Sequence, residues 1–152
     1  MTALFEHSPW VEARADAAPS SGDRHADLMA VVYAATRAEQ LALIRAHPEL
    51  AGKAAVDGTL TQASTAEQAS AGLDRLTAEE FERFHALNTA YRAAHDMPFI
   101  ICVRLTNKAG ILAAMEARIA QDTPTEIATA LAEIGKITQL RLKDIGPKEQ
   151  GQ

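Results

Sequence analysis

The sequence predicts an all-α fold, a single compact domain of about seven helices. Apolar residues recur at the three- and four-residue spacing of a helix face in several separate segments. Several Ser/Thr-x-x-Glu patterns have the form of a helix capping box, and no alternating strand pattern stands out. The length of 152 residues suits one domain with its own core, so we expect a single domain over residues 1–152.

The first helices are expected between a loop and a proline. The loop is PSSGDR, residues 19–24, and a helical stripe follows it. A capping box at Thr36–Glu39 begins the next helix, which reaches His47. Pro48 ends that helix, because proline lacks a backbone N–H and clashes with the preceding turn. The apolar positions of these two helices are Leu28, Val31, Val32, Ala35, Leu41 and Ile44.

A strong helical pattern runs from a second capping box at Thr77–Glu80 to about Ala94. The stripe along one face of this helix consists of Phe81, Phe84, Asn88 and Tyr91. A buried amide must be hydrogen-bonded, so we predict that Asn88 holds a neighbouring backbone segment in place.

The apolar run PFIICV, residues 98–103, is compatible with a buried extended segment and with the start of a helix. It contains Cys102, the only cysteine, so no internal disulfide is possible. We interpret Cys102 as a small buried apolar residue. The alternative is a cysteine nucleophile that works with a histidine. Another helix is expected over residues 108–121.

The last helix is expected to begin with Thr123 as its N-cap and Pro124 at its first position, and to reach about Asp144. Its apolar stripe is Ile127, Ala130, Leu131, Ile134 and Ile137. Arg141 falls on the same face. A buried guanidinium needs compensation, so Arg141 either binds a ligand or pairs with a carboxylate at the edge of the stripe.

The composition excludes several classes of protein. A net charge of −5 argues against a nucleic-acid surface. No apolar run approaches the roughly 20 residues of a membrane span, and no signal-peptide pattern is present, so we expect a cytoplasmic protein. The histidines and the cysteine show no metal-ligand spacing, so no metal is expected. Glycine motifs for phosphate or dinucleotide binding are absent too.

Several polar residues remain unexplained. In ASTAEQASAGL, residues 63–73, Ser64 and Glu67 fit a capping box that serves backbone amides. Alternatively, this helix N-terminus binds a polar ligand, with Gln68 as donor and acceptor. His47 could contact the carbonyls of the helix C-terminus, remain an ordinary surface histidine, or project into a pocket. These residues alone name no substrate.

Six stretches resemble, in order, the OHCU decarboxylase family. They are FEHSPWV at Phe5, HPELAGK at His47, STAEQASAGL at Ser64, NTAY at Asn88, PFIICVR at Pro98 and EIGKITQLRLKDI at Glu133. Each motif alone is weak, but six in register over nearly the whole chain are specific. The resemblance implies an all-helical, cofactor-free homodimer. It also implies that the small-molecule substrate 2-oxo-4-hydroxy-4-carboxy-5-ureidoimidazoline is converted to (S)-allantoin in urate degradation.

The same resemblance implies a set of site residues. His47 would be the general acid/base, hydrogen-bonded to Glu67 as the second catalytic residue. Arg141 and Gln68 would hold carbonyl groups of the substrate. The residues implied to bind substrate are Pro48, Ser64, Gln68, Phe99, Ile100, Ile101, Cys102, Val103 and Arg141.

The chain departs from the family pattern in one place. After the tyrosine the family usually shows a basic residue and then a Phe-Gly-Phe-Pro run. Here the corresponding residues are Ala94, His95, Asp96 and Met97. We therefore expect one wall of the pocket to be shaped differently.

Two other functions remain open. A non-enzymatic helical interaction domain predicts that His47, Glu67 and Arg141 are separate surface features. A metal- or cysteine-dependent hydrolase predicts a metal site or a reactive Cys102. Whether His47, Glu67 and Arg141 converge on one pocket distinguishes these readings.

Overall fold

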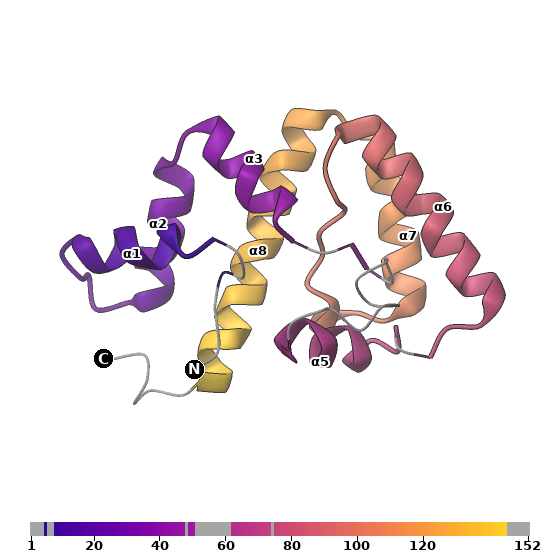
Figure 1. The fold of residues 1–152 in the computed structure, drawn as a ribbon, viewed down its shortest axis with the longest axis horizontal. Helices are drawn as coiled ribbons and strands as arrows, with labels where there is room; N and C mark the ends of the chain where they lie inside the picture. The colour runs from indigo at the N-terminus through magenta and orange to yellow at the C-terminus, as the bar shows by residue number, and fades with distance from the viewer. Residues whose placement is uncertain (1–4, 6–7, 48, 51–61, 74, 146–152) are drawn as a thin grey trace.

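The computed structural model describes residues 5, 8–47, 49–50, 62–73 and 75–145, with only the backbone for 62–64 and 145. Within these ranges it contains seven α-helices, one 3-10 helix and no strand, which confirms the all-α class (Figure 1). The elements are α1 (Trp10–Ala17), α2 (Arg24–Ala34), α3 (Arg37–Arg45), α5 (Gln62–Ser70), α6 (Ala78–His95), η1 (Val103–Leu105), α7 (Lys108–Ile119) and α8 (Thr123–Ile145).

Both Thr-x-x-Glu boxes at the starts of α3 and α6 form as predicted. The Thr36 hydroxyl accepts from the Glu39 N–H at 3.1 Å, and the Glu39 carboxylate accepts from the Thr36 N–H at 3.1 Å. Thr77 and Glu80 make the same reciprocal pair at 3.1 and 2.9 Å. Each box satisfies N–H groups that the first turn of a helix leaves without a partner.

The start of α8 differs from the expectation. Thr123 is the first helical residue rather than the N-cap, and the Glu126 N–H already bonds to the Asp122 carbonyl at 3.0 Å. The Thr123 hydroxyl lies 2.9 Å from Nδ1 of His95, so it joins α8 to the end of α6. A tertiary contact thus takes the hydroxyl that the sequence pattern assigns to capping.

Helix α8 runs through the middle of the molecule (Figure 1). The helices α1, α2 and α3 lie on one side of it and α6 and α7 on the other, with α5 near the lower half of α8 and against η1. The buried residues Ile127, Ala130, Leu131 and Ile134 confirm most of the predicted stripe. Burial of this face joins the two groups of helices through the hydrophobic effect.

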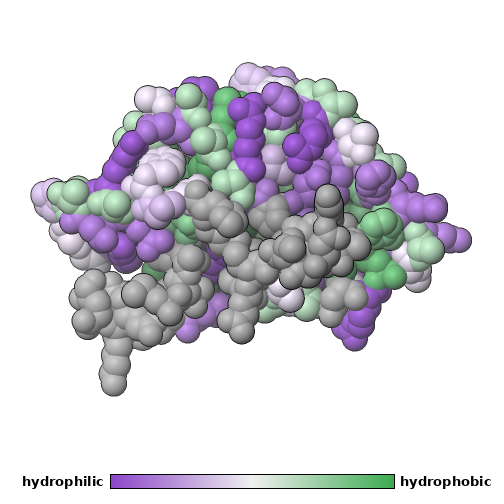
Figure 2. Space-filling view, in the orientation of Figure 1, coloured by the Kyte–Doolittle hydropathy of each residue, from purple (hydrophilic) through white to green (hydrophobic). Residues whose placement is uncertain are grey.

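The apolar run after α6 is extended rather than helical until η1 begins at Val103. This settles the question that periodicity left open. Met97, Phe99 and Ile100 are buried, with exposed fractions of 3% or less. We call residues 99–103 the wall segment. On the molecular face in Figure 2, hydrophilic and hydrophobic residues are interspersed.

Candidate functional site

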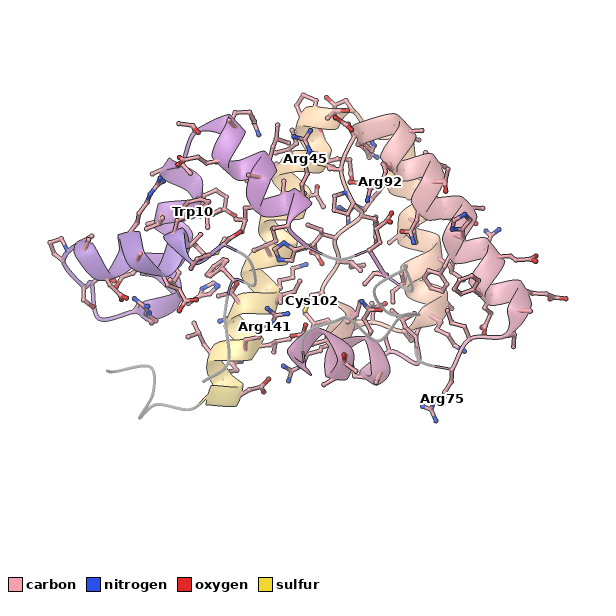
Figure 3. The ribbon with its side chains drawn as sticks, viewed as in Figure 1. Trp10, Arg45, Arg75, Arg92, Cys102 and Arg141 are labelled. Carbon is pink, nitrogen blue, oxygen red and sulfur yellow. The ribbon has the colours of Figure 1, made fainter. Side chains whose placement is uncertain are left out.

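One pocket lies where the end of α3, helix α5, the wall segment and α8 meet. It encloses about 480 Å³, part of it open to solvent. Its lining residues are His47, Leu50, Glu67, Gln68, Phe99, Ile100, Ile101, Cys102, Val103, Arg104, Ile137 and Arg141. Arg141 and Cys102 lie near each other close to the centre of Figure 3. The residues that the sequence singled out from distant positions therefore converge here.

His47 follows the C-terminus of α3 and is half-buried. Its Nδ1 lies 2.9 Å from the Leu43 carbonyl oxygen, and its backbone N–H bonds to the Ile44 carbonyl at 3.1 Å. Because a carbonyl only accepts, Nδ1 carries the hydrogen in the neutral ring, and Nε2 is the nitrogen that gains and loses the second proton. The contact with helix carbonyls and the position in a pocket are thus both realised.

Glu67 and Arg141 form a two-pronged ion pair between α5 and α8. Nε of Arg141 donates to one carboxylate oxygen at 2.8 Å, and Nη2 donates to the other at 2.7 Å. The Arg141 side chain is 4% exposed and that of Glu67 is 13% exposed. Such planar forks match guanidinium to carboxylate geometry. Arg141 is therefore both buried with a carboxylate partner and part of the pocket lining.

The other predicted residues are placed as follows. Gln68 is buried, with 5% exposed, and lines the pocket one residue after Glu67. The backbone of Ser64 lies in α5, whereas its side chain is outside the described part of the structure. Pro48 also lies outside the described residues. The hydrogen bond expected between His47 and Glu67 stays a prediction.

The wall segment is bonded to two helices behind it. The Cys102 N–H donates to a carboxylate oxygen of Glu133, on α8, at 2.9 Å. Nη1 of Arg118, on α7, donates to the Ile100 carbonyl at 2.7 Å, and the guanidinium lies 4.3 Å from the centre of the Phe99 ring. These contacts fix the backbone that borders the pocket.

Arg118 is itself held by a buried acid. Its Nε donates to Glu126 at 2.8 Å, and the Tyr91 hydroxyl donates to the same oxygen at 2.7 Å. Burial and the bond to Glu126 raise the pKa of Tyr91. Glu126 is 1% exposed, so this network belongs to the protein interior behind the wall segment.

Cys102 lines the pocket but lacks the environment of a nucleophile. Its side chain is 2% exposed. Burial raises the pKa of the Cys102 thiol, and the negative charges of Glu133 and Glu67 raise it further. The thiol therefore stays protonated at neutral pH, which supports its interpretation as a buried apolar residue.

Asn88 fulfils the role predicted for it. Its Nδ2 donates to the Leu50 carbonyl at 2.9 Å, and the side chain is 6% exposed. Leu50 lines the pocket, so the bond fixes a piece of the border that follows His47 in the chain. Periodicity could find Asn88, because a polar residue in an apolar stripe is visible in the sequence.

The residues that depart from the family pattern, 94–97, close α6 and do not line the pocket. His95 is buried and bonds to the hydroxyl of Thr123. Asp96 adopts the left-handed conformation at the helix C-terminus, with φ of 56°, which aspartate tolerates better than most residues. Met97 is fully buried. These residues therefore determine how α6 ends, and the differently shaped pocket wall stays a prediction.

Leu50, Arg104 and Ile137 line the pocket although the sequence did not place them in the site. Leu50 lies in a turn and Arg104 in the short 3-10 helix η1, so their spacing carries no signal. Among the described residues, no group of three or more His, Cys, Asp or Glu side chains is arranged to hold a metal ion. No helix in the described part of the chain is long and apolar enough to cross a membrane.

Comparisons with known proteins give one consistent family. The OHCU decarboxylase family model matches residues 1–143. The 2-oxo-4-hydroxy-4-carboxy-5-ureidoimidazoline decarboxylase of Haloferax volcanii is 40% identical over 144 residues, covering 93% of this chain and 83% of that protein. The uric acid degradation bifunctional protein PucL of Bacillus subtilis is 39% identical over 145 residues, which cover 93% of this chain and 28% of that longer protein.

The fold has a solved counterpart. The crystal structure of an OHCU decarboxylase in the presence of (S)-allantoin aligns with a TM-score of 0.71 at 18% sequence identity. The alignment covers 93% of this chain and 94% of that one. At this identity the likeness speaks for the fold, while the sequence matches speak for the family.

Proposed function

The chain belongs to the OHCU decarboxylase family, and we propose that it converts 2-oxo-4-hydroxy-4-carboxy-5-ureidoimidazoline to (S)-allantoin in urate degradation. The observation that carries this proposal is the convergence of His47, the Glu67–Arg141 pair and the wall segment on one pocket. An interaction domain gives no reason for these residues, far apart in the sequence, to meet in a concave site.

The reaction breaks the bond between a ring carbon and its carboxylate. Carbon dioxide leaves, and the electron pair of the broken bond moves into the conjugated ring of the substrate, which leaves an enol. A proton then forms the new C–H bond on one face of the neighbouring, ureido-bearing carbon, and the enol hydroxyl loses its proton to become the ring carbonyl of allantoin. The protein has to orient the carboxylate, stabilise the developing charge and deliver that proton. Because the substrate ring itself accepts the electrons, the proposal requires no cofactor.

His47 is the proposed proton donor. The bond from its Nδ1 to the Leu43 carbonyl fixes the orientation of the ring and assigns the second proton to Nε2. A fixed donor on one side of the pocket delivers the proton to one face of a planar intermediate. This supports formation of a single enantiomer rather than a racemate.

The Glu67–Arg141 pair and the neighbouring groups position the substrate. With Nε and Nη2 bound to Glu67, the guanidinium is held in one plane at the pocket. Arg141 and Gln68 then hold carbonyl groups of the ring or the ureido arm, and Glu67 acts with His47. Pro48, Ser64 and the wall segment, residues 99–103, complete the binding site in this proposal.

We further propose that residues 1–152 act as one domain, as a homodimer in the cytoplasm. The support is the resemblance to a family of commonly dimeric enzymes. Light scattering on the purified protein measures the mass directly. A monomer at micromolar concentration would contradict the dimer without affecting the proposed reaction.

The activity is tested with freshly generated substrate, followed by circular dichroism of the allantoin that forms. We expect (S)-allantoin to accumulate faster than the substrate decays spontaneously. Racemic product at the spontaneous rate would overturn the proposed function.

A further inference from the structure

Two arginines line the pocket, and they are held differently. Arg141 is buried and matched to the buried carboxylate of Glu67. Arg104 follows the wall segment in η1, and its Nη1 and Nη2 donate to the two carboxylate oxygens of Asp144 at 2.6 and 3.2 Å. The side chains of Arg104 and Asp144 are 30% and 56% exposed. The second fork is therefore open to water and to exchange.

The proposed substrate brings a carboxylate into this pocket. The charge of Arg141 is already offset by Glu67, so Arg104 is the other permanent cation among the described lining residues. The whole chain carries a net charge of −5, so its overall field does not attract an anion. Recognition of the carboxylate therefore has to come from a local cation.

We propose that Arg104 is a substrate-selecting residue that binds the carboxylate of the substrate by exchanging it for Asp144. This inference rests on the proposed function. A guanidinium fork fits either carboxylate equally well. An exposed ion pair between two surface side chains contributes little to folding, so its exchange disturbs the fold little.

The charge of Arg104 is secure during the exchange. The hydrogen bonds that Arg104 donates to Asp144 raise the pKa of Arg104, and the negative charge of Glu67 raises it further. Arg104 lines the same pocket as Glu67, which places its charge beside an anion bound there.

The exchange explains how substrate enters and product leaves. When the C–C bond breaks, the carboxylate departs as neutral carbon dioxide, and allantoin carries no carboxylate. Arg104 then returns to Asp144, and the product loses the contact that retained the substrate. A contact that is about equally strong in the ground state and the transition state lowers KM without raising kcat. The competing Asp144 limits how tightly the ground state is held.

The two partners of this ion pair give opposite predictions. Arg104→Met should raise KM about tenfold or more, the loss typical of one charged hydrogen bond, with kcat changed little. Asp144→Asn keeps the size of the side chain, removes the competing charge, and should lower KM. If the pair only stabilises the fold, both variants change KM in the same direction or not at all, and either result overturns the inference.

Two controls isolate the effect. Arg83 and Glu116 form another exposed ion pair, between α6 and α7 and outside the pocket lining. Arg83→Met should leave KM unchanged while losing a comparable surface pair. Binding of (S)-allantoin, measured by calorimetry, should be the same for Arg104→Met and the unaltered protein, because the product has no carboxylate.

The outcomes separate this inference from the proposed function. If the unaltered protein does not make (S)-allantoin, the proposed function fails. If it does, but Arg104→Met keeps its KM or loses affinity for substrate and (S)-allantoin equally, only the selecting role of Arg104 fails.

Discussion

His47 combines two features in one side chain: its Nδ1 is bonded to the end of α3, and the residue lines the pocket. We expect His47→Gln to keep the fold, because the residue is only half-buried and an amide can still donate to the Leu43 carbonyl. The rate should fall by about 10²–10⁴-fold, the usual contribution of a positioned acid/base group. The rate of (S)-allantoin formation, followed by circular dichroism, measures this loss.

The control is His25→Gln. His25 bonds to the Gly135 carbonyl at 2.8 Å and does not line the pocket, so the activity of this variant should be near normal. Near-normal enantioselective turnover by His47→Gln would remove His47 from the mechanism.

Arg141 and Glu67 should behave as one unit. Arg141→Lys keeps the charge but cannot reproduce the two-pronged fork. We expect a folded protein whose substrate binding is weaker by about 1.5–3 kcal/mol and whose Tm is lower. The effects of Arg141→Lys and Glu67→Gln should be less than additive in the double variant, because each breaks the same pair. Additive losses would show that the two side chains act independently.

At the scale of elements, the wall segment depends on a side chain that does not face the substrate. Glu133→Leu leaves the buried Cys102 N–H without its acceptor, which costs about 1–3 kcal/mol of stability. Glu133→Gln keeps an acceptor oxygen there. We therefore expect a raised KM and a lower Tm for Glu133→Leu, and much smaller changes for Glu133→Gln.

Lys136→Met is the matched control for Glu133, because it removes the exposed partner of the same carboxylate and leaves the bond to Cys102 in place. Its kinetics should match the unaltered protein. Equal KM values for Glu133→Leu and Lys136→Met would mean that the wall keeps its position without Glu133.

The sequence predicted helix starts better than contacts between elements. A capping box involves residues three positions apart, so Thr36–Glu39 and Thr77–Glu80 could be recognised locally. The sequence does not predict helix α1, because only Val11 and Ala15 of its eight residues are buried and they make no clear stripe. The hydroxyl of Thr123 was assigned to a cap, whereas a residue 28 positions away takes it.

At the scale of the whole molecule, the candidate site is formed where the end of α3, helix α5, the wall segment and α8 meet. The family resemblance named His47, Glu67, Gln68, Arg141 and the wall segment, and the fold brings them to one pocket. The sequence could not place Arg104 there or pair it with Asp144, 40 positions further along. Neither residue breaks a hydrophobic pattern, and pairs of this kind depend on how elements pack.

Stability of the whole chain should depend on acidic pH. Hydrogen bonds from Arg14, and then from Thr36, lower the pKa of Glu39 to about 2. The Thr77 N–H and Lys108 lower the pKa of Glu80. These carboxyls bind protons more weakly in the folded chain, so their stabilisation is present above their unfolded pKa of 4.5 and is lost as pH falls through the folded values.

We therefore expect the Tm to be nearly constant between about pH 7 and 5 and to fall between about pH 4.5 and 2. Thermal melts followed by circular dichroism measure it. Glu39→Gln should reduce the dependence on pH in that range. A Tm at pH 3 equal to that at pH 7 would show that the ionised carboxylates of Glu39 and Glu80 do not stabilise the folded chain.

The wall segment has a consequence for how such a pocket can evolve. Its backbone is held by Glu133 and Arg118 from behind, whereas its side chains border the pocket in front. The position of the wall segment is thus set by Glu133 and Arg118, whereas the surface of the pocket is set by the side chains of the segment itself. Mutations at Ile100 or Ile101 can reshape the cavity while the carbonyl and N–H groups stay bonded. Substitutions in the wall segment can therefore change which ligands the pocket prefers while the fold and the position of the segment are kept.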